Sequence, residues 1–169
     1  MASETNKPLR VLFLCTHNAA RSQISEALLS RRGGDRFVVA SAGADPASEV
    51  HPYAIEALLR AGINWSGRRP KGLDAVLGER WDLVITVCDR AREVCPRFPG
   101  RPITAHWGIP DPAETRGDDT TRREAFWTTL VYLSRRIDLL VAPPHEKLER
   151  MSLEHGVRAI GDEVRNDKE

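Results

Sequence analysis

Short apolar runs alternate along the chain with segments whose apolar residues recur every three or four positions. The runs are Arg10–Leu14, Phe37–Ala40, Asp82–Val87 and Ile103–His106. Apolar runs of this length are typical of strands that are buried in a parallel sheet. The pattern therefore predicts an α/β fold in which helices cover both faces of a parallel sheet.

The segments between the strands carry helix start and stop signals, chiefly proline at the start and glycine at the end. Helices are expected to end near Arg31, to run from Pro52 to Gly62, to cover Leu73–Leu77 and to run from Thr121 to Val141. We expect the buried stripe of the last helix to hold Trp127, Leu130, Ser134, Ile137 and Val141.

The charges of the chain nearly cancel, which limits its partners. It has 25 Lys and Arg against 24 Asp and Glu, a formal net charge of +1. No basic block favours nucleic acid, and no stretch approaches the roughly 20 apolar residues of a membrane span. Residues 1–8 lack the apolar core of a signal peptide, and the three cysteines fit reactive thiols better than a disulfide-stapled secreted fold. We therefore expect a cytoplasmic protein without nucleic-acid or membrane partners.

The most informative motif lies between the first strand and the first helix and reads Cys15-Thr16-His17-Asn18-Ala19-Ala20-Arg21-Ser22. In such a loop, backbone N–H groups and the helix N-terminus can point inward and bind an oxyanion. Arg21 can hold two anion oxygens with its fork of donors. The same positive field favours the thiolate of Cys15, so we expect a nucleophile with a depressed pKa. The competing interpretation is a buried structural thiol.

Other residues of this loop and its surroundings have two interpretations each. Asn18 suits a left-handed backbone and Ser22 can donate to the thiolate, although both could be ordinary turn and capping residues. His17 either tunes the thiolate or faces solvent. Trp107 is expected mainly to pack. The basic residues Arg68, Arg69 and Lys71 could border the mouth of the site, but a solvated loop is the better interpretation.

Cys15, Cys88 and the segment after His106 each follow the end of a predicted strand. Because the carboxyl ends of parallel strands meet at one edge of a sheet, these residues are expected to lie together. Asp111, in Ile-Pro-Asp-Pro-Ala, is the candidate general acid. Taken alone, an Asp-Pro turn would explain it equally well.

Cys88 and Cys95 are separated by seven positions. If the segment were helical throughout, the two Cα atoms would be ~10 Å apart, whereas a disulfide needs less than about 7 Å. A Cys88–Cys95 disulfide would thus require the segment to unwind or bend, which predicts a redox-driven conformational switch. The alternatives are two unrelated cysteines, or a zinc site whose companion ligands are missing at the usual spacing.

Together these motifs resemble the thioredoxin-coupled arsenate reductases built on the low-molecular-weight protein tyrosine phosphatase fold. The resemblance runs from about Leu9 to about Val141 and is most specific at Cys15–Gln23, Val87–Asp89, Val94–Pro96 and His106–Ala113. It implies a three-layer fold with a four-stranded parallel sheet in the order 2-1-3-4. We expect a flexible N-terminus at 1–8, a catalytic domain at 9–142 and a C-terminal extension at 143–169.

The resemblance also implies a relay of three thiols. Cys15 would attack arsenate that is held by the loop amides and Arg21, and Asp111 would help the departing oxygen take a proton. Cys88 would attack the sulfur of Cys15 and expel arsenite, and Cys95 would then move the disulfide to Cys88–Cys95 for reduction by thioredoxin. Phosphate or sulfate would compete as oxyanions, and no cofactor is expected.

Some positions depart from the pattern of the family. His17 replaces a glycine found in many members and resembles actinobacterial relatives that use a low-molecular-weight thiol such as mycothiol, and glutaredoxin is a further possible donor. Some members bind potassium through residues that match Asn18, Glu26 and Ser41 plus an aspartate. The fourth position falls near Lys71-Gly72, and a basic residue there argues against an ion, so no metal is expected.

Two other functions compete with this one. The same cradle and acid would hydrolyse phosphate esters, but Ala113-Glu114 replace the aromatic residues that usually follow the Asp-Pro of such phosphatases. Cys88 and Cys95 would then have no purpose, so we expect only weak phosphatase activity. An oxyanion sensor without turnover is the third possibility, against which Asp111 and the set of three thiols argue.

Overall fold

The computed structural model describes residues 7–89, 91, 95–143, 157–158 and 160. Its centre is a parallel sheet of β1 (Leu9–Cys15), β2 (Phe37–Gly43), β3 (Leu83–Thr86) and β4 (Ile103–His106). The strand order is β2-β1-β3-β4, with all three pairings parallel, which confirms the predicted architecture. The four expected strands all form. At the centre of the sheet, β3 is buried along its whole length and β1 is buried except at its first two residues.

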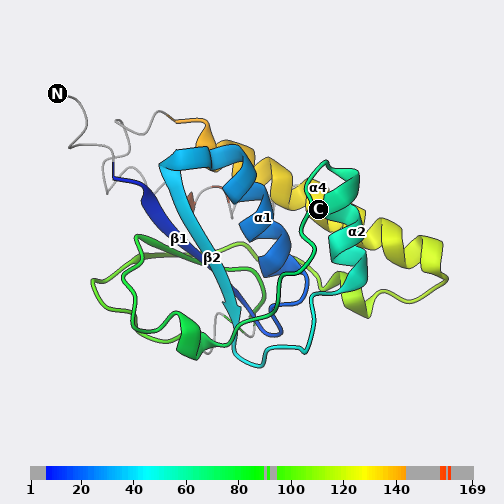
Figure 1. The fold of residues 1–169 in the computed structure, drawn as a ribbon, viewed down its shortest axis with the longest axis horizontal. Helices are drawn as coiled ribbons and strands as arrows, with labels where there is room; N and C mark the ends of the chain where they lie inside the picture. Colours follow the sequence, from blue (N-terminus) through cyan, green and yellow to red (C-terminus); the bar gives the residue numbers. More distant parts are fainter. Residues whose placement is uncertain (1–6, 90, 92–94, 144–156, 159, 161–169) are drawn as a thin grey trace.

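Three helices gather on one side of the view in Figure 1. They are α1 (Arg21–Gly33), α2 (Pro52–Arg60) and α4 (Asp119–Val141), and single 3-10 turns form η1 (Gly34–Arg36), η2 (Leu73–Ala75) and η3 (Pro112–Glu114). Helix α1 packs on β1 and β2, and α4 packs on α1 and α2. The short helical piece expected at Leu73–Leu77 is the 3-10 turn η2.

Helix α4 buries a different stripe from the expected one. Its buried residues are Phe126, Thr129, Leu130, Leu133, Arg136, Ile137 and Leu140. Only Leu130 and Ile137 belong to both sets, because the helix turns its Phe126 and Leu133 side toward the core. Trp127 lies at the edge of the stripe, where the guanidinium of Arg60 sits 4.0 Å from the centroid of its ring.

Strand β2 continues three residues beyond the expected end at Ala40. Ser41, Ala42 and Gly43 pair in register with the last three residues of β1, so that Cys15 lies opposite Gly43. Small residues carry little strand signal of their own, and the extension depends on pairing with β1. It brings the β2 backbone to the base of the loop that follows Cys15.

Part of the sequence after α4 packs against this domain. Val157 and Ile160 are buried, and the carbonyl of Val157 accepts a 3.2 Å hydrogen bond from the indole N–H of Trp107. Trp107 is fully buried and its ring lies 6.0 Å from that of Phe13, which confirms its packing role.

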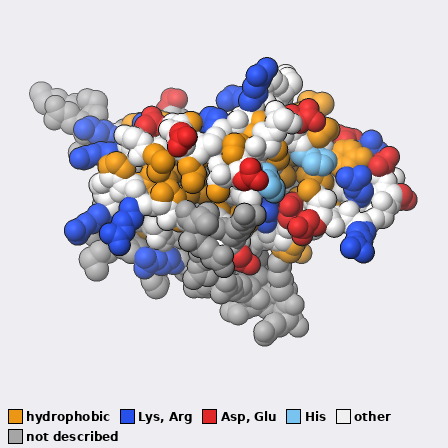
Figure 2. Space-filling view, turned by 90° about the horizontal axis from the view of Figure 1, so that it is seen from below, with side chains coloured by type: hydrophobic (Ala, Val, Ile, Leu, Met, Phe, Trp, Pro, Cys, Tyr) orange, Lys and Arg blue, Asp and Glu red, His pale blue; other side chains and the backbone are white. Residues whose placement is uncertain are grey.

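The surface carries mixed charge. On the face in Figure 2, acidic and basic side chains are interspersed, and histidine side chains lie among them. In the described ranges, no helix has both the length and the apolar character required to cross a membrane.

Candidate functional site

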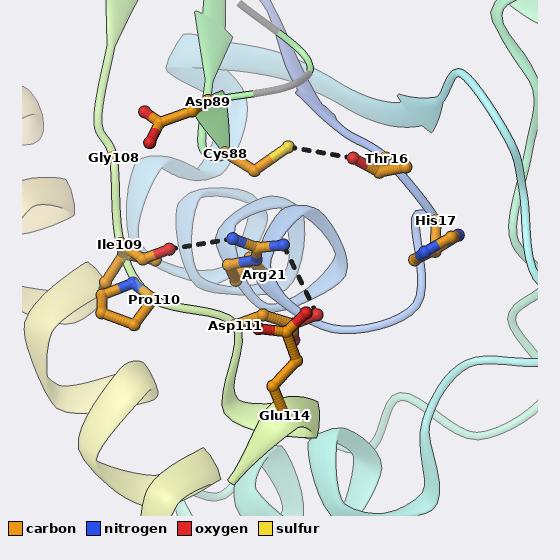
Figure 3. A pocket seen from close by; sticks show the side chains of 10 residues that line it. All are labelled: Thr16, His17, Arg21, Cys88, Asp89, Gly108, Ile109, Pro110, Asp111 and Glu114. Atoms are coloured by element: carbon orange, nitrogen blue, oxygen red, sulfur yellow. Dashed lines mark hydrogen bonds and ion pairs between the residues drawn. The ribbon is translucent and has the colours of Figure 1, made fainter.

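A cavity of about 550 Å³ opens at the carboxyl edge of the sheet. Its lining comes from three segments that are distant in the sequence: 16–21 after β1, 88–89 after β3 and 108–114 after β4 (Figure 3). The structure therefore brings together the residues that follow three predicted strand ends, as expected for an open α/β sheet.

The oxyanion loop, residues 15–22, is held from outside by the support segment, residues 44–51. Backbone N–H groups of this segment donate to loop carbonyls: Ala44 to Cys15 at 3.4 Å, Asp45 to Thr16 at 2.8 Å, Ala47 to His17 at 2.9 Å and His51 to Ala19 at 2.8 Å. Because these carbonyls point to the support segment, the loop can offer its N–H groups to an anion. No sequence motif marks this segment, because its donors are main-chain N–H groups.

Gly43 permits the close approach of β2 to the oxyanion loop. A Cβ at this position would lie 2.6 Å from the carbonyl oxygen of Thr16 and 2.8 Å from the nitrogen of Asn18. Both neighbours are backbone atoms that cannot rotate away. The last residue of β2 is therefore a glycine for reasons of space.

Asn18 connects the oxyanion loop to its surroundings and uses all four of its side-chain hydrogen-bonding positions. It adopts the left-handed backbone that was predicted, with φ 51°. Its amide group donates to Ser22 and Ser41 at 2.8 and 2.9 Å, and its oxygen accepts from Gln23 and from the backbone N–H of Lys71 at 3.0 and 2.8 Å. The fully satisfied side chain is buried and locks the loop conformation.

The sulfur of Cys15 lies within hydrogen-bond distance of two donors, the Ser22 hydroxyl and the Asn18 backbone N–H. Ser22 Oγ is 2.8 Å away, and since Ser22 already accepts from Asn18, its own hydrogen is free for the sulfur. The backbone N–H of Asn18 also donates to this sulfur at 3.2 Å. Ser22 thus lies where the sequence predicted a donor to the nucleophile.

The expected depression of the Cys15 pKa is not what the structure gives. Burial raises the pKa of this thiol, because only 3% of the residue is exposed and a thiolate there loses its hydration. The hydrogen bonds from Ser22 and Asn18 and the charge of Arg21 lower the pKa, but burial has the larger effect. The sequence identified the stabilising groups and underestimated how deeply the sulfur lies.

Arg21 and Asp111 meet across the cavity (Figure 3). Arg21 Nη1 donates to the carbonyl of Ile109 at 2.8 Å, and its Nη2 lies 3.7 Å from Asp111 Oδ2. Asp111 also accepts from the backbone N–H of Ala113 at 3.0 Å and caps η3. The turn interpretation and the placement expected of a general acid therefore both hold. The Ile109 carbonyl was not identified from the sequence, because main-chain partners leave no residue signature.

Cys88 lies on the wall of the cavity and points toward the oxyanion loop. Its sulfur is 3.3 Å from Thr16 Oγ1, and the backbone N–H of Ala91 donates to it at 3.4 Å. Cys95 is half-buried, which raises its pKa, and its thiol donates weakly to the Pro96 carbonyl at 3.8 Å. All three thiols are free.

Cys95 lines a second, small cavity together with Cys15. Residues 90 and 92–94, between Cys88 and Cys95, lie outside the described residues. The redox-driven switch predicted for that segment therefore stays a prediction.

Of the remaining polar residues singled out from the sequence, His17 reaches the cavity and Arg68 does not. His17 lines its rim, but the ring is exposed and Nδ1 lies 3.0 Å from the Asp45 carbonyl. The guanidinium of Arg68 stacks on Trp65, 4.2 Å from the ring centroid. These basic residues match the interpretation as a solvated loop.

Glu26 ends the polar network that starts at Cys15. Ser41 donates to Glu26 Oε1 at 2.9 Å, and Lys71 Nζ lies 4.0 Å from the same oxygen. Burial raises the pKa of this carboxyl, while Ser41 and Lys71 act in the opposite direction. Lys71 therefore supplies positive charge at the position that the sequence analysis compared with a potassium site. The described residues contain no cluster of His, Cys, Asp or Glu that could hold a metal ion.

Comparisons with known proteins agree with this arrangement. A family model described as "Low molecular weight phosphotyrosine protein phosphatase" matches residues 10–152. An arsenate reductase of Halalkalibacterium halodurans is 36% identical over 127 residues, which make up 75% of this chain and 91% of the relative.

Solved structures show the same similarity. An arsenate reductase in the phosphate-binding state has a TM-score of 0.68 and 28% identity, covering 79% of this chain and 97% of that one. A thioredoxin-dependent arsenate reductase of Corynebacterium glutamicum has a TM-score of 0.54 and 36% identity, covering 82% of this chain and 65% of that one.

Proposed function

The chain belongs to the low-molecular-weight phosphotyrosine protein phosphatase family, and on this premise we propose that it reduces arsenate to arsenite. In this proposal Cys15, Cys88 and Cys95 relay the electrons and thioredoxin restores the thiols. The observation that carries the proposal is the Cys88 thiol, 3.3 Å from Thr16 and on the wall of the cavity that holds Arg21 and Asp111. Ester hydrolysis needs no second thiol there.

The first step joins arsenate to Cys15. The loop amides and Arg21 hold the oxyanion, whose charge they complement. An S–As bond forms and an As–O bond breaks. Because burial raises the pKa of Cys15, its proton leaves as the sulfur attacks. This proton passes through the Asp111 carboxyl to the departing As–OH oxygen, which leaves as water and restores Asp111 to its starting state.

The second step moves two electrons to arsenic. The sulfur of Cys88 attacks the sulfur of Cys15, so that an S–S bond forms and the S–As bond breaks. The bonding electron pair stays on arsenic, which falls from As(V) to As(III) and leaves as arsenite. The proton of Cys88 passes to an arsenite oxygen, and the two thiols are oxidised to one disulfide.

The third step returns the oxyanion loop to its thiol form. Cys95 attacks the sulfur of Cys88 and releases Cys15, which leaves a Cys88–Cys95 disulfide. The dithiol of thioredoxin then reduces this disulfide by exchange. The relative in Corynebacterium glutamicum that is called thioredoxin-dependent supports this donor. A relay that depends on free thiols also supports a location in the reducing cytoplasm.

A phosphatase activity is the second candidate, and the family model favours it. The cradle, Arg21 and Asp111 would suffice for it, because phosphate and arsenate have the same shape and charge. Glu114 lines the cavity behind Asp111 and would repel an anionic phosphopeptide. We therefore propose only weak phosphatase activity, with phosphate and sulfate as competing oxyanions.

The test couples arsenate reduction to NADPH consumption through thioredoxin and thioredoxin reductase, for wild type, Cys88→Ser and Cys95→Ser. Wild type is expected to turn over continuously. Cys95→Ser should release about one arsenite per enzyme and stop, and Cys88→Ser should release none. If Cys95→Ser turns over like wild type, the donor is a low-molecular-weight thiol, to be checked with mycothiol or glutaredoxin. Tight arsenate binding without turnover by any donor would support a sensor instead.

A further inference from the structure

We propose that His106 is a positioning residue that holds Cys88 at the cavity wall by fixing its neighbour Asp89. This inference rests on the proposed function, because it concerns the second thiol of the relay. His106 ends β4, and Cys88 follows β3 by two residues. The imidazole joins these two strand ends at the edge where the chemistry takes place.

Both ring nitrogens of His106 are engaged. Nδ1 lies 2.7 Å from Thr86 Oγ1, and Nε2 lies 2.8 Å from Asp89 Oδ1. The His106 side chain is 11% exposed, whereas that of Asp89 is 90% exposed. A carboxylate this exposed ordinarily moves freely in solvent. Here the Asp89 carboxylate bonds to the shielded ring of His106, and that ring bonds to the buried Thr86. The two bonds restrain the backbone directly after Cys88.

Gly108 leaves room for this contact. A Cβ at position 108 would lie 2.8 Å from His106 Nε2 and 3.6 Å from Asp89 Oδ1. Gly108 and Asp89 both line the cavity, and the next residue, Ile109, accepts the hydrogen bond from Arg21. A glycine at position 108 therefore leaves the room that the contact between His106 and Asp89 occupies beside the cavity.

A fixed position of Cys88 matters for the proposed arsenate reduction but not for ester hydrolysis, which does not use this thiol. Cys88 must approach the sulfur of Cys15 in line with the S–As bond, and its rate depends on how closely it is held to that geometry. The contacts of its sulfur are long, 3.3 Å to Thr16 Oγ1 and 3.4 Å to the Ala91 backbone nitrogen, and sulfur hydrogen bonds are weak. The shorter bond of Asp89 to His106 supplies the firmer attachment.

The variants separate the two contacts of the ring. His106→Asn can keep the bond to Thr86 but does not reach Asp89, whereas His106→Gln can reach Asp89. Asp89→Ala removes the same contact from the other side. Asp35→Ala is the matched control, because it removes an exposed carboxylate from η1, outside the cavity and away from the pair. Reduced enzyme is mixed with arsenate in the absence of a reductant, and arsenite release is followed together with the loss of two thiols.

We expect His106→Asn and Asp89→Ala each to slow this single turnover about tenfold, as for one lost hydrogen bond to a charged group. The double variant should be no slower than either single one, since both remove one contact. His106→Gln should recover most of the rate. Phosphate affinity and hydrolysis of para-nitrophenyl phosphate should change at least fivefold less than arsenite release. Equal losses in the reductase and phosphatase assays, or an unchanged arsenite rate, would overturn the proposal.

A second readout does not depend on arsenate reduction. Alkylation of each cysteine by iodoacetamide is measured by peptide mass spectrometry with phosphate bound. Loss of the pair should speed the alkylation of Cys88, which is 5% exposed, and leave that of Cys15 unchanged. If wild type releases no arsenite but Cys88 alkylation responds in this way, the proposed function fails and the positioning role stands. If alkylation does not respond, the positioning role fails by itself.

Discussion

The two sides of the cavity are held in different ways. On the oxyanion-loop side, four carbonyls bind the support segment and Asn18 uses every side-chain donor and acceptor it has. On the other side, Cys88 has two long sulfur contacts and a neighbour bound through one exposed carboxylate. An anion site needs fixed donors, whereas in the proposed relay Cys88 bonds first with one cysteine and then with another, so it is held at few points. In that proposal the contrast separates binding from electron transfer within one cavity.

The largest effect is expected from Arg21→Lys, which tests the fixed side directly. Lysine keeps the charge but loses the fork that reaches Ile109 and Asp111 at once. We expect kcat/KM for arsenate to fall about 100-fold, as when one preorganised donor is removed from an anion site. The melting temperature should stay within a few degrees. A loss of less than fivefold would mean that the loop amides alone hold the anion.

The next largest effect is expected from Gly43→Ala. The added methyl group would meet backbone atoms of Thr16 and Asn18 at 2.6 and 2.8 Å. We expect a loss of about 1–3 kcal/mol in the free energy of unfolding by urea, as for other overpacked sites, together with weaker phosphate binding by calorimetry. Gly78→Ala is the matched control, since nothing lies within 4 Å of a Cβ there. Similar losses in both variants would show that the oxyanion loop yields easily.

A smaller effect, which depends on pH, is expected from Glu26→Gln. Burial raises the pKa of Glu26, so the folded protein holds this proton more tightly than the unfolded chain. The contribution to stability is complete below the ordinary value of 4.5 and is lost as pH rises toward the folded pKa. Glutamine does not ionise, so the Glu26→Gln variant lacks this loss. Its free energy of unfolding by urea, compared with that of wild type, should therefore improve as the pH rises from 4 to 8. The opposite trend would mean that the charge of Lys71 outweighs burial.

The smallest effect is expected from Thr16→Val, which tests the loosely held side. Valine keeps the shape of threonine but removes the hydroxyl 3.3 Å from the Cys88 sulfur. Because sulfur hydrogen bonds are weak, we expect single-turnover arsenite release to change by no more than about threefold. Thr16→Ser, which keeps the hydroxyl, should match wild type. A tenfold loss in Thr16→Val alone would show that this contact, rather than Asp89, positions Cys88.

Local sequence patterns predicted the strands and the position of the oxyanion loop well. The apolar runs located every strand, and the strand–loop–helix context of Cys15 and Arg21 located the cradle. The stripe of α4 was misjudged, because helical spacing alone does not say which of two overlapping stripes faces the core. The end of β2 was missed because Ser41, Ala42 and Gly43 form a strand only through pairing with β1.

The candidate site depends on contacts between segments that are distant in the sequence, and it does so more than the secondary structure does. The donors of the support segment are main-chain N–H groups, which any residue type but proline would supply, and the carbonyl at position 109 would be present with any residue type. The Cys15 pKa depends on burial that only the packed structure defines. The pairing of His106 with Asp89 joins residues 17 positions apart in the sequence, and no motif links them.

The support segment also determines which substitutions this loop can accept. Its donors are the N–H groups at positions 44, 45, 47 and 51, and Pro46 falls between two of them where no donor is used. Ala44, Asp45 and Ser48 have exposed side chains, so their identity is only weakly constrained. A designer could therefore vary the exposed side chains at 44 and 45, provided that neither becomes proline, because proline would delete a donor that shapes the cradle. The rule applies to the backbone and leaves the side chains open, which makes this stretch a place to change the surface without rebuilding the anion site.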